Sequence, residues 1–157
     1  MITVNIIAVG QIKDGFNVSA CNEYIKRLSK YCKLNVIEIK EQNLPKNYSN
    51  KDVENLKNAE SENIKKHITN GHNILLNITG VQYSSADFAN KIKEISNTNS
   101  TVNFIIGGSH GTSNSLVGMC ENISFSKLTF PHQLFRVILL EQIYRAFTII
   151  ANLPYHK

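Results

Sequence analysis

A regular alternation between short apolar runs and helical patterns is the feature that most constrains the fold of this chain. Five runs rich in aliphatic and β-branched residues lie at 3–9, 34–39, 73–79, 101–106 and 122–126. Between and after them, helical patterns or short helical stretches lie at 16–32, 49–68, 84–95, 115–120 and 133–150. This alternation predicts an α/β fold, a mostly parallel sheet with helices on both faces. The length of 157 residues suits a single domain over 1–157.

Composition narrows the class of protein further. Hydrophobic residues make up 42% of the chain and charged residues 18%, values that are ordinary for a folded protein and argue against disorder. No apolar stretch reaches membrane-spanning length, and the amino terminus lacks the pattern of a secretion signal, so a cytoplasmic location and no membrane partner are expected. The net charge of +5 is compatible with an RNA partner, but it is spread along the chain and is a weak indicator.

The three cysteines show neither a C-x-x-C pair nor histidines at metal-ligand spacing, so no metal site is expected. Cys21 and Cys32 fall on the apolar side of the helix expected over 16–32. Both are therefore expected to be buried free thiols.

The most informative turn is "IIGGSHG", residues 105–111, which follows the fourth expected strand. It does not match the G-x-G-x-x-G of dinucleotide sites or the G-x-x-x-x-G-K-[ST] of P-loops. The turn is expected to hold a nucleoside-like ligand that carries no phosphate. A bulky residue in place of Gly108 is expected to fill the ligand's space and abolish binding without disturbing the fold.

The last expected helix, 133–150, is apolar around most of its circumference. It is interpreted either as a core helix or, preferably, as a helix whose outer face forms a homodimer interface. Arg136 and Arg145 are among its few charges. They could pair with Glu141 inside the protein or hold RNA phosphate near an active site.

Three segments taken in order, "IIGGSHG", "ISFSKLTFPHQLFRVILLEQIYRA" and the terminal "PYHK", carry a specific resemblance. The chain resembles the small α/β-knot methyltransferases of the SPOUT class, and within it the ribosomal RNA large subunit methyltransferase H family, over its whole length. The resemblance implies a C-terminal trefoil knot that binds S-adenosyl-L-methionine. It also implies a homodimer that methylates N3 of a pseudouridine in 23S ribosomal RNA on the assembled ribosome.

The same resemblance implies a set of site residues. The implied cofactor contacts are Leu76, Gly108, Phe125, Ser126, Lys127, Leu128, Thr129 and Phe130. The implied catalytic residues are His132, Arg136, Tyr155 and His156. Either histidine could accept the N3 proton at neutral pH, although His132 could instead cap the last helix. Tyr155 could stack on the target base or hydrogen-bond to it.

Two other functions remain open. One is another SPOUT reaction, on a ribose 2′-hydroxyl or a transfer-RNA base, although such enzymes often carry an added RNA-binding domain. The other is a non-catalytic module that binds RNA or a nucleotide, which would leave "FSKLTFPH" and "YHK" without a purpose.

Overall fold

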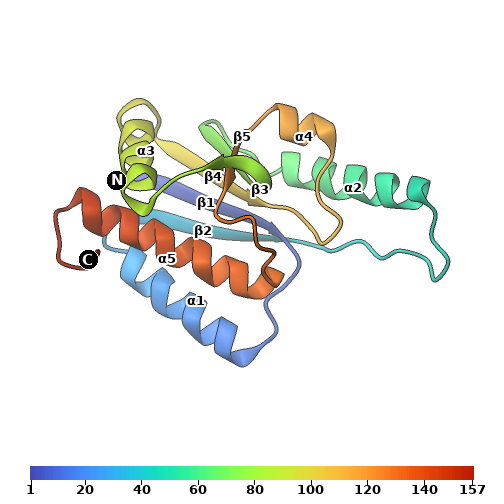
Figure 1. Ribbon diagram of the computed structural model, residues 1–157, viewed down its shortest axis with the longest axis horizontal. Coiled ribbons are helices and arrows are strands. Elements are labelled where there is room, and N and C mark those ends of the chain that lie inside the picture. The colour runs from blue at the N-terminus through green and yellow to red at the C-terminus, as the bar shows by residue number, and fades with distance from the viewer.

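A computed structural model describes all residues from 1 to 157 (Figure 1). Its strands are β1 (Ile2–Val9), β2 (Cys32–Ile39), β3 (His72–Gln82), β4 (Thr101–Ile106) and β5 (Glu121–Ser124). Its helices are α1 (Gly15–Leu28), α2 (Asn50–Lys65), α3 (Ser85–Thr98), α4 (Asn114–Gly118) and α5 (His132–Ile150). The predicted alternation of strands and helices is confirmed.

The five strands form one sheet in the order β2-β1-β4-β3-β5, and every neighbouring pair is parallel. From β1 the chain leaves toward β2, whereas from β4 it leaves toward β5 at the other edge. The carboxyl ends of β1 and β4 therefore flank a topological switch point, the place where open parallel sheets bind ligands.

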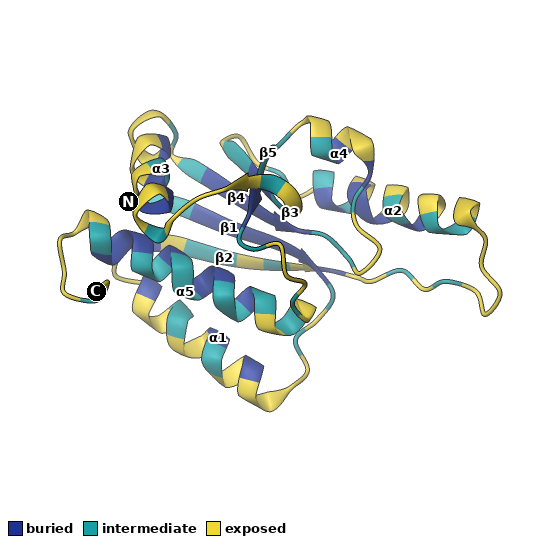
Figure 2. Cartoon of the chain, viewed as in Figure 1, coloured by how far each residue is buried: buried dark blue, intermediate teal, exposed yellow.

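Alternate residues of each strand face opposite sides of the sheet. On one side Val4 and Ile6 of β1 belong to a large core covered by α1, α3 and α5. On the other side Ile7 and Val9 belong to a smaller core covered by α2 and α4. Figure 2 shows the buried residues concentrated in the strands between these helices. The expectation of helices on both faces is confirmed.

A row of asparagine side chains, here called the asparagine row, crosses the sheet from β2 to β3. Asn35, Asn5, Asn103 and Asn73 occupy paired positions on neighbouring strands. Each amide Nδ2 donates to the next Oδ1 at 2.8 Å, in the order Asn35, Asn5, Asn103, Asn73. Because a slip of one strand would break this chain of hydrogen bonds, the row fixes the register of four strands.

Several boundaries differ by a few residues from the sequence expectation, and two of these differences affect packing. The third strand does not end before Gly80 but continues to Gln82, with a register shift that sets both Leu76 and Val81 opposite Ile123 of β5. A Cβ on Gly80 would lie 2.6 Å from the backbone of β5, so only glycine permits this approach. Helix α1 ends at Leu28, and Cys32 opens β2 instead of lying on the helix.

The free thiols of Cys21 and Cys32 are both buried, as expected. No helix combines the length and the apolar character that crossing a bilayer requires.

Helix α5 covers the sheet between α1 and α3 (Figure 1). Seven of its 19 residues are buried, among them Leu139, Leu140 and Ile143. Much of its apolar circumference therefore belongs to the core of the chain. Leu134 and Ile150, at its two ends, are the large apolar side chains of α5 that stay exposed.

Candidate ligand and active site

An apolar cavity of about 430 Å³ opens at the ends of β4 and β5 and beside the middle of β3. Seven of the eight predicted cofactor contacts line it: Leu76, Gly108, Phe125, Ser126, Leu128, Thr129 and Phe130. The structure thus brings together three segments that are far apart in the sequence. Lys127 is exposed and does not line the cavity.

The glycine turn owes its shape to backbone pairing within it. Gly108 and Gly111 form an antiparallel bridge, and the Gly111 amide donates to the Gly108 carbonyl at 3.0 Å. Gly111 has φ +87°, a conformation that favours glycine. The turn then leads into Ser113, which caps α4 by accepting from the Leu116 amide.

The expectation that a side chain at position 108 would fill the ligand's space is wrong. A Cβ there would not point into the apolar cavity. It would collide with the carboxylate of Glu60 on α2 and approach Cγ1 of Val9 to 3.3 Å. Glycine at position 108 therefore leaves room for the Glu60 carboxylate on the protein side of the turn, and a bulky residue would have to displace that carboxylate.

The segment from Phe125 to Phe130 is shaped by short-range contacts. The Ser126 side chain accepts from the Leu128 amide at 3.0 Å. Phe130 stacks on Phe135 of α5, and Phe125 meets the same ring edge-on. These contacts leave Leu128 71% exposed at the mouth of the cavity, where an apolar ligand would cover it.

A second cavity, of about 590 Å³, lies on the other side of the glycine turn. Gly108, Ser109 and His132 line both cavities. Lys13, Lys40, Glu38, Glu41 and Arg136 make this second cavity strongly polar. An apolar and a polar cavity therefore share one wall at the switch point.

His132 is the titratable side chain on this shared wall. Desolvation lowers its pKa, and the proximity of Glu41 opposes that effect. The imidazole is therefore neutral at neutral pH and can accept a proton. Its possible capping role is not realised, because Pro131 occupies the N-cap position and His132 is the first residue of α5.

Arg136 is buried, and its partner is not Glu141. Its guanidinium donates through Nη2 to the Gly10 carbonyl at 2.9 Å and pairs through Nη1 with Glu38 at 3.2 Å. It therefore joins α5 to the ends of β1 and β2 at the polar cavity, while its Nε has no partner.

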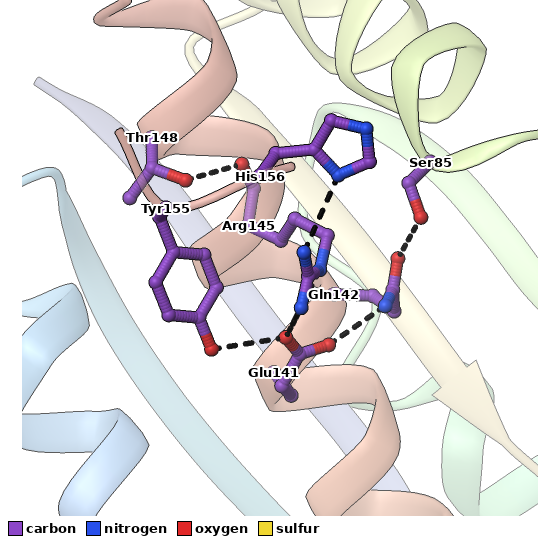
Figure 3. Close-up of polar contacts among 7 residues, drawn as sticks. All are labelled: Ser85, Glu141, Gln142, Arg145, Thr148, Tyr155 and His156. Atoms are coloured by element: carbon purple, nitrogen blue, oxygen red, sulfur yellow. Dashed lines mark hydrogen bonds and ion pairs between the residues drawn. The ribbon is translucent and has the colours of Figure 1, made fainter. Parts of the chain in front are cut away.

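Arg145 does pair with Glu141, and this pair anchors the carboxyl terminus (Figure 3). Glu141 Oε1 accepts from Arg145 Nη2 at 2.7 Å and from the Tyr155 hydroxyl at 3.1 Å. His156 Nδ1 lies 3.3 Å from Arg145 Nη1. Burial and the neighbouring Glu141 raise the pKa of Tyr155, so this phenol stays protonated. The tail is held in place and is not frayed.

The tail does not reach the cavities of its own chain. The sequence separation between His132 and Glu141 places the two residues roughly 14 Å apart along the axis of α5. Figure 1 places the carboxyl terminus beside the end of α5 that lies away from the glycine turn. Tyr155 and His156 are thus brought together with each other but not with His132.

Glu60, which lies behind Gly108 and lines neither cavity, is a buried acidic residue beside the site that was not predicted from the sequence. Spacing along the helix could have indicated its burial, because Glu60 lies four residues from both Leu56 and Ile64, which are apolar positions of α2. The structure buries all three on one face of that helix.

The parallel sheet with its two cavities at the switch point defines a class: α/β proteins whose ligand sites lie at the carboxyl ends of the strands. Two solved structures share the fold. A probable methylase family protein from Haemophilus influenzae Rd KW20 aligns with a TM-score of 0.53 and 13% identity, over 98% of this chain and 70% of that one. TrmJ from Z. mobilis ZM4 aligns with a TM-score of 0.51 and 10% identity, over 93% of this chain and 70% of that one.

The chain belongs to the SPOUT methyltransferase family, because the family model described as a predicted SPOUT methyltransferase matches residues 2–156. Proteins named ribosomal RNA large subunit methyltransferase H are close in sequence. The protein from Clostridium botulinum strain Hall is 48% identical over 98% of this chain and 99% of its own length. The protein from Clostridium acetobutylicum is 43% identical over the same shares.

Proposed function

We propose that this protein is an S-adenosylmethionine-dependent methyltransferase that modifies N3 of a pseudouridine in 23S ribosomal RNA. One observation carries the proposal: an apolar cavity and a polar cavity share the wall formed by Gly108, Ser109 and His132. The two cavities adjoin at these residues, so a methyl donor bound in one and a nucleotide bound in the other would come into contact there. The names of the related clostridial proteins support ribosomal RNA as the substrate.

The apolar cavity fits the proposed cofactor. Its polar groups are hydroxyls, amides and backbone atoms, together with Lys57 and His132, and no phosphate-binding motif is present. Leu76, Leu128 and Phe130 would contact the adenosine, and the glycine turn would offer backbone donors and acceptors to its edge. When bound, S-adenosylmethionine supplies a methyl group that is already activated by a sulfonium. The protein must therefore mainly align the reactants and remove the N3 proton.

His132 is the proposed acceptor for that proton. Its neutral imidazole lies on the shared wall, so it can face a base held in the polar cavity. Lys13 and Lys40 at the rim would bind RNA phosphates, and Arg136 would hold the end of β1 in place through Gly10. No three His, Cys, Asp or Glu side chains are grouped to hold a metal ion. The proposal uses none.

The position of the tail supports a homodimer. Because Tyr155 and His156 lie away from the cavities of their own chain, they can serve catalysis only at the cavities of a second copy. Residues 1–157 are built around one sheet, so the surfaces of both copies would contact the RNA. We therefore propose that the dimer recognises the assembled ribosome in the cytoplasm.

We also infer the trefoil knot that the family resemblance implies. Strand β5 pairs with both halves of β3, and in Figure 1 the segment between those halves crosses in front of β5. Passage of the chain from β5 to α5 behind this segment would close the cavity between Leu76 and Phe130.

The test is transfer of labelled methyl from S-adenosylmethionine to ribosomal particles from cells that lack this gene. We expect label only in assembled ribosomes, at one pseudouridine, and none in free large subunits. His132→Asn is expected to keep cofactor binding and lose transfer. Label in transfer RNA alone, or bound cofactor without any transfer, would overturn the proposed substrate or the proposed activity respectively.

A further inference from the structure

The carboxyl group of Glu60 is buried without a complete set of partners. Glu60 is 2% exposed, and one oxygen, Oε1, accepts from the Gln42 amide at 3.0 Å. The other oxygen, Oε2, has no hydrogen-bond partner. A buried carboxylate oxygen without a hydrogen-bond donor costs folding free energy. Such a group in a folded protein therefore indicates a functional role.

Glu60 Oε2 stands directly behind the wall of the apolar cavity. It occupies the direction that a Cβ of Gly108 would take, and Gly108 lines the cavity. The missing side chain leaves only backbone between the carboxyl group and the cavity. Lys57, one turn earlier on α2, also lines the cavity, so this face of the helix approaches the ligand.

The apolar cavity has no acidic side chain in its own lining. No Asp or Glu is among the residues that line it, whereas Lys57 and His132 are. Yet the proposed cofactor is a cation: its sulfonium and ammonium outweigh its one carboxylate. Methyl transfer removes the sulfonium charge, so the product S-adenosylhomocysteine carries no net charge. A lining that holds Lys57 and no carboxylate disfavours the cationic donor, so a negative charge nearby is needed to favour it.

We infer that Glu60 is that charge: it is a specificity-determining residue whose carboxylate favours the cationic methyl donor over the uncharged product. This inference rests on the proposed function. A unit charge that acts through one layer of backbone at low dielectric is enough to change affinity roughly tenfold. The same preference would help spent product leave.

The neighbours of Glu60 set its charge. Its pKa is raised, chiefly by burial and also by the nearby Glu41. The Gln42 hydrogen bond and His110 on the glycine turn oppose this shift. A bound cation would also lower the pKa. Binding of the donor is therefore coupled to loss of a proton from Glu60, while binding of the product is not.

The experiment compares binding of S-adenosylmethionine and S-adenosylhomocysteine by titration calorimetry in wild type, Glu60→Gln and Glu62→Gln. Glu62 is a matched control, because it lies on the same helix but is exposed and pairs with Lys65. In Glu60→Gln we expect donor affinity to fall roughly tenfold while product affinity changes less than about threefold. Glu62→Gln should change neither.

Equal weakening of both ligands in Glu60→Gln would mean a structural role and would overturn the inference, as would no change in either. A second arm needs no variant: in wild type, the ratio of donor to product affinity should rise with pH across the range in which Glu60 titrates. Titration of His132 affects wild type and Glu60→Gln alike, so the difference between their profiles isolates Glu60. If wild type binds neither ligand, the proposed function itself fails.

Discussion

At the scale of single residues, Gly108 and Glu60 must be considered as a pair. Gly108 could be predicted from "IIGGSHG" as part of a ligand turn, but the direction of its missing Cβ could not. That direction depends on α2, which lies almost 50 residues earlier and on the other face of the sheet from α5. The local motif thus identifies the turn, and only tertiary packing explains it.

Gly108→Ala is expected to destabilise the protein by about 1–3 kcal/mol, because the new Cβ would overpack against Glu60. In the Glu60→Ala background the same change should cost much less, since the colliding carboxyl is gone. Urea unfolding of the two single variants and the double variant measures this coupling. Gly118→Ala is the control, because a Cβ at Gly118 meets nothing within 4 Å. Additive effects would contradict the contact.

Glu60 should also make stability depend on pH. Its pKa is raised in the folded protein, so ionisation costs folding energy. Its contribution is most favourable below the usual glutamate pKa and is lost as pH rises through the raised value. Glu60→Gln should therefore be more stable than wild type at pH 7, with the advantage vanishing near pH 4. Thermal melts at both pH values test this; an advantage that is larger at pH 4 would refute it.

At the scale of elements, periodicity predicted where helices and strands lie. The fourth strand has the bounds that were expected, and the helix expected to start near residue 49 begins after Ser49, whose side chain and Asp52 are bonded reciprocally. Errors arose where long-range contacts override local pattern. Only the partner strand β5 explains why β3 continues beyond Gly80, and only the sheet explains why Cys32 leaves the helical pattern.

Long-range contacts also explain why some parts of the site could be predicted and others could not. The segments around Leu76, Gly108 and Phe130 could be predicted to lie together, because they lie toward the carboxyl edge of one parallel sheet. The partner of Arg136 is Glu38 on β2, which no spacing along α5 could indicate. The anchoring of Tyr155 to Glu141 likewise appears only when the tail folds back.

The asparagine row predicts an unequal cost along its length. Asn103→Ala should destabilise by roughly 3 kcal/mol, because it removes the partners of the Asn5 and Asn73 side chains and of the Thr69 carbonyl in a buried place. Asn35→Ala, at the half-buried end of the row, should cost about 1 kcal/mol or less, since water can replace its single bond to Asn5. Equal losses in urea unfolding would contradict the greater burial and larger number of partners of Asn103.

At the scale of the whole molecule, the proposed dimer can be tested by measuring the mass of the protein in solution. We expect sedimentation at micromolar concentration to give twice the mass of one chain. Leu134→Asp, which places a charge on the exposed apolar end of α5, should weaken association. Met119→Asp introduces the same charge at another exposed apolar position, on the side of α2 and α4, and should not. A monomer in wild type would contradict the dimer.

The asparagine row also has a consequence for how this sequence can change over generations. Each inner member donates to one neighbour and accepts from another, so no single replacement keeps all the bonds. Loss of one asparagine leaves its neighbours with unpaired buried polar groups, which destabilise the protein more than four apolar side chains would. Positions 5, 35, 73 and 103 should therefore covary among related chains: all four stay amides, or they become apolar together.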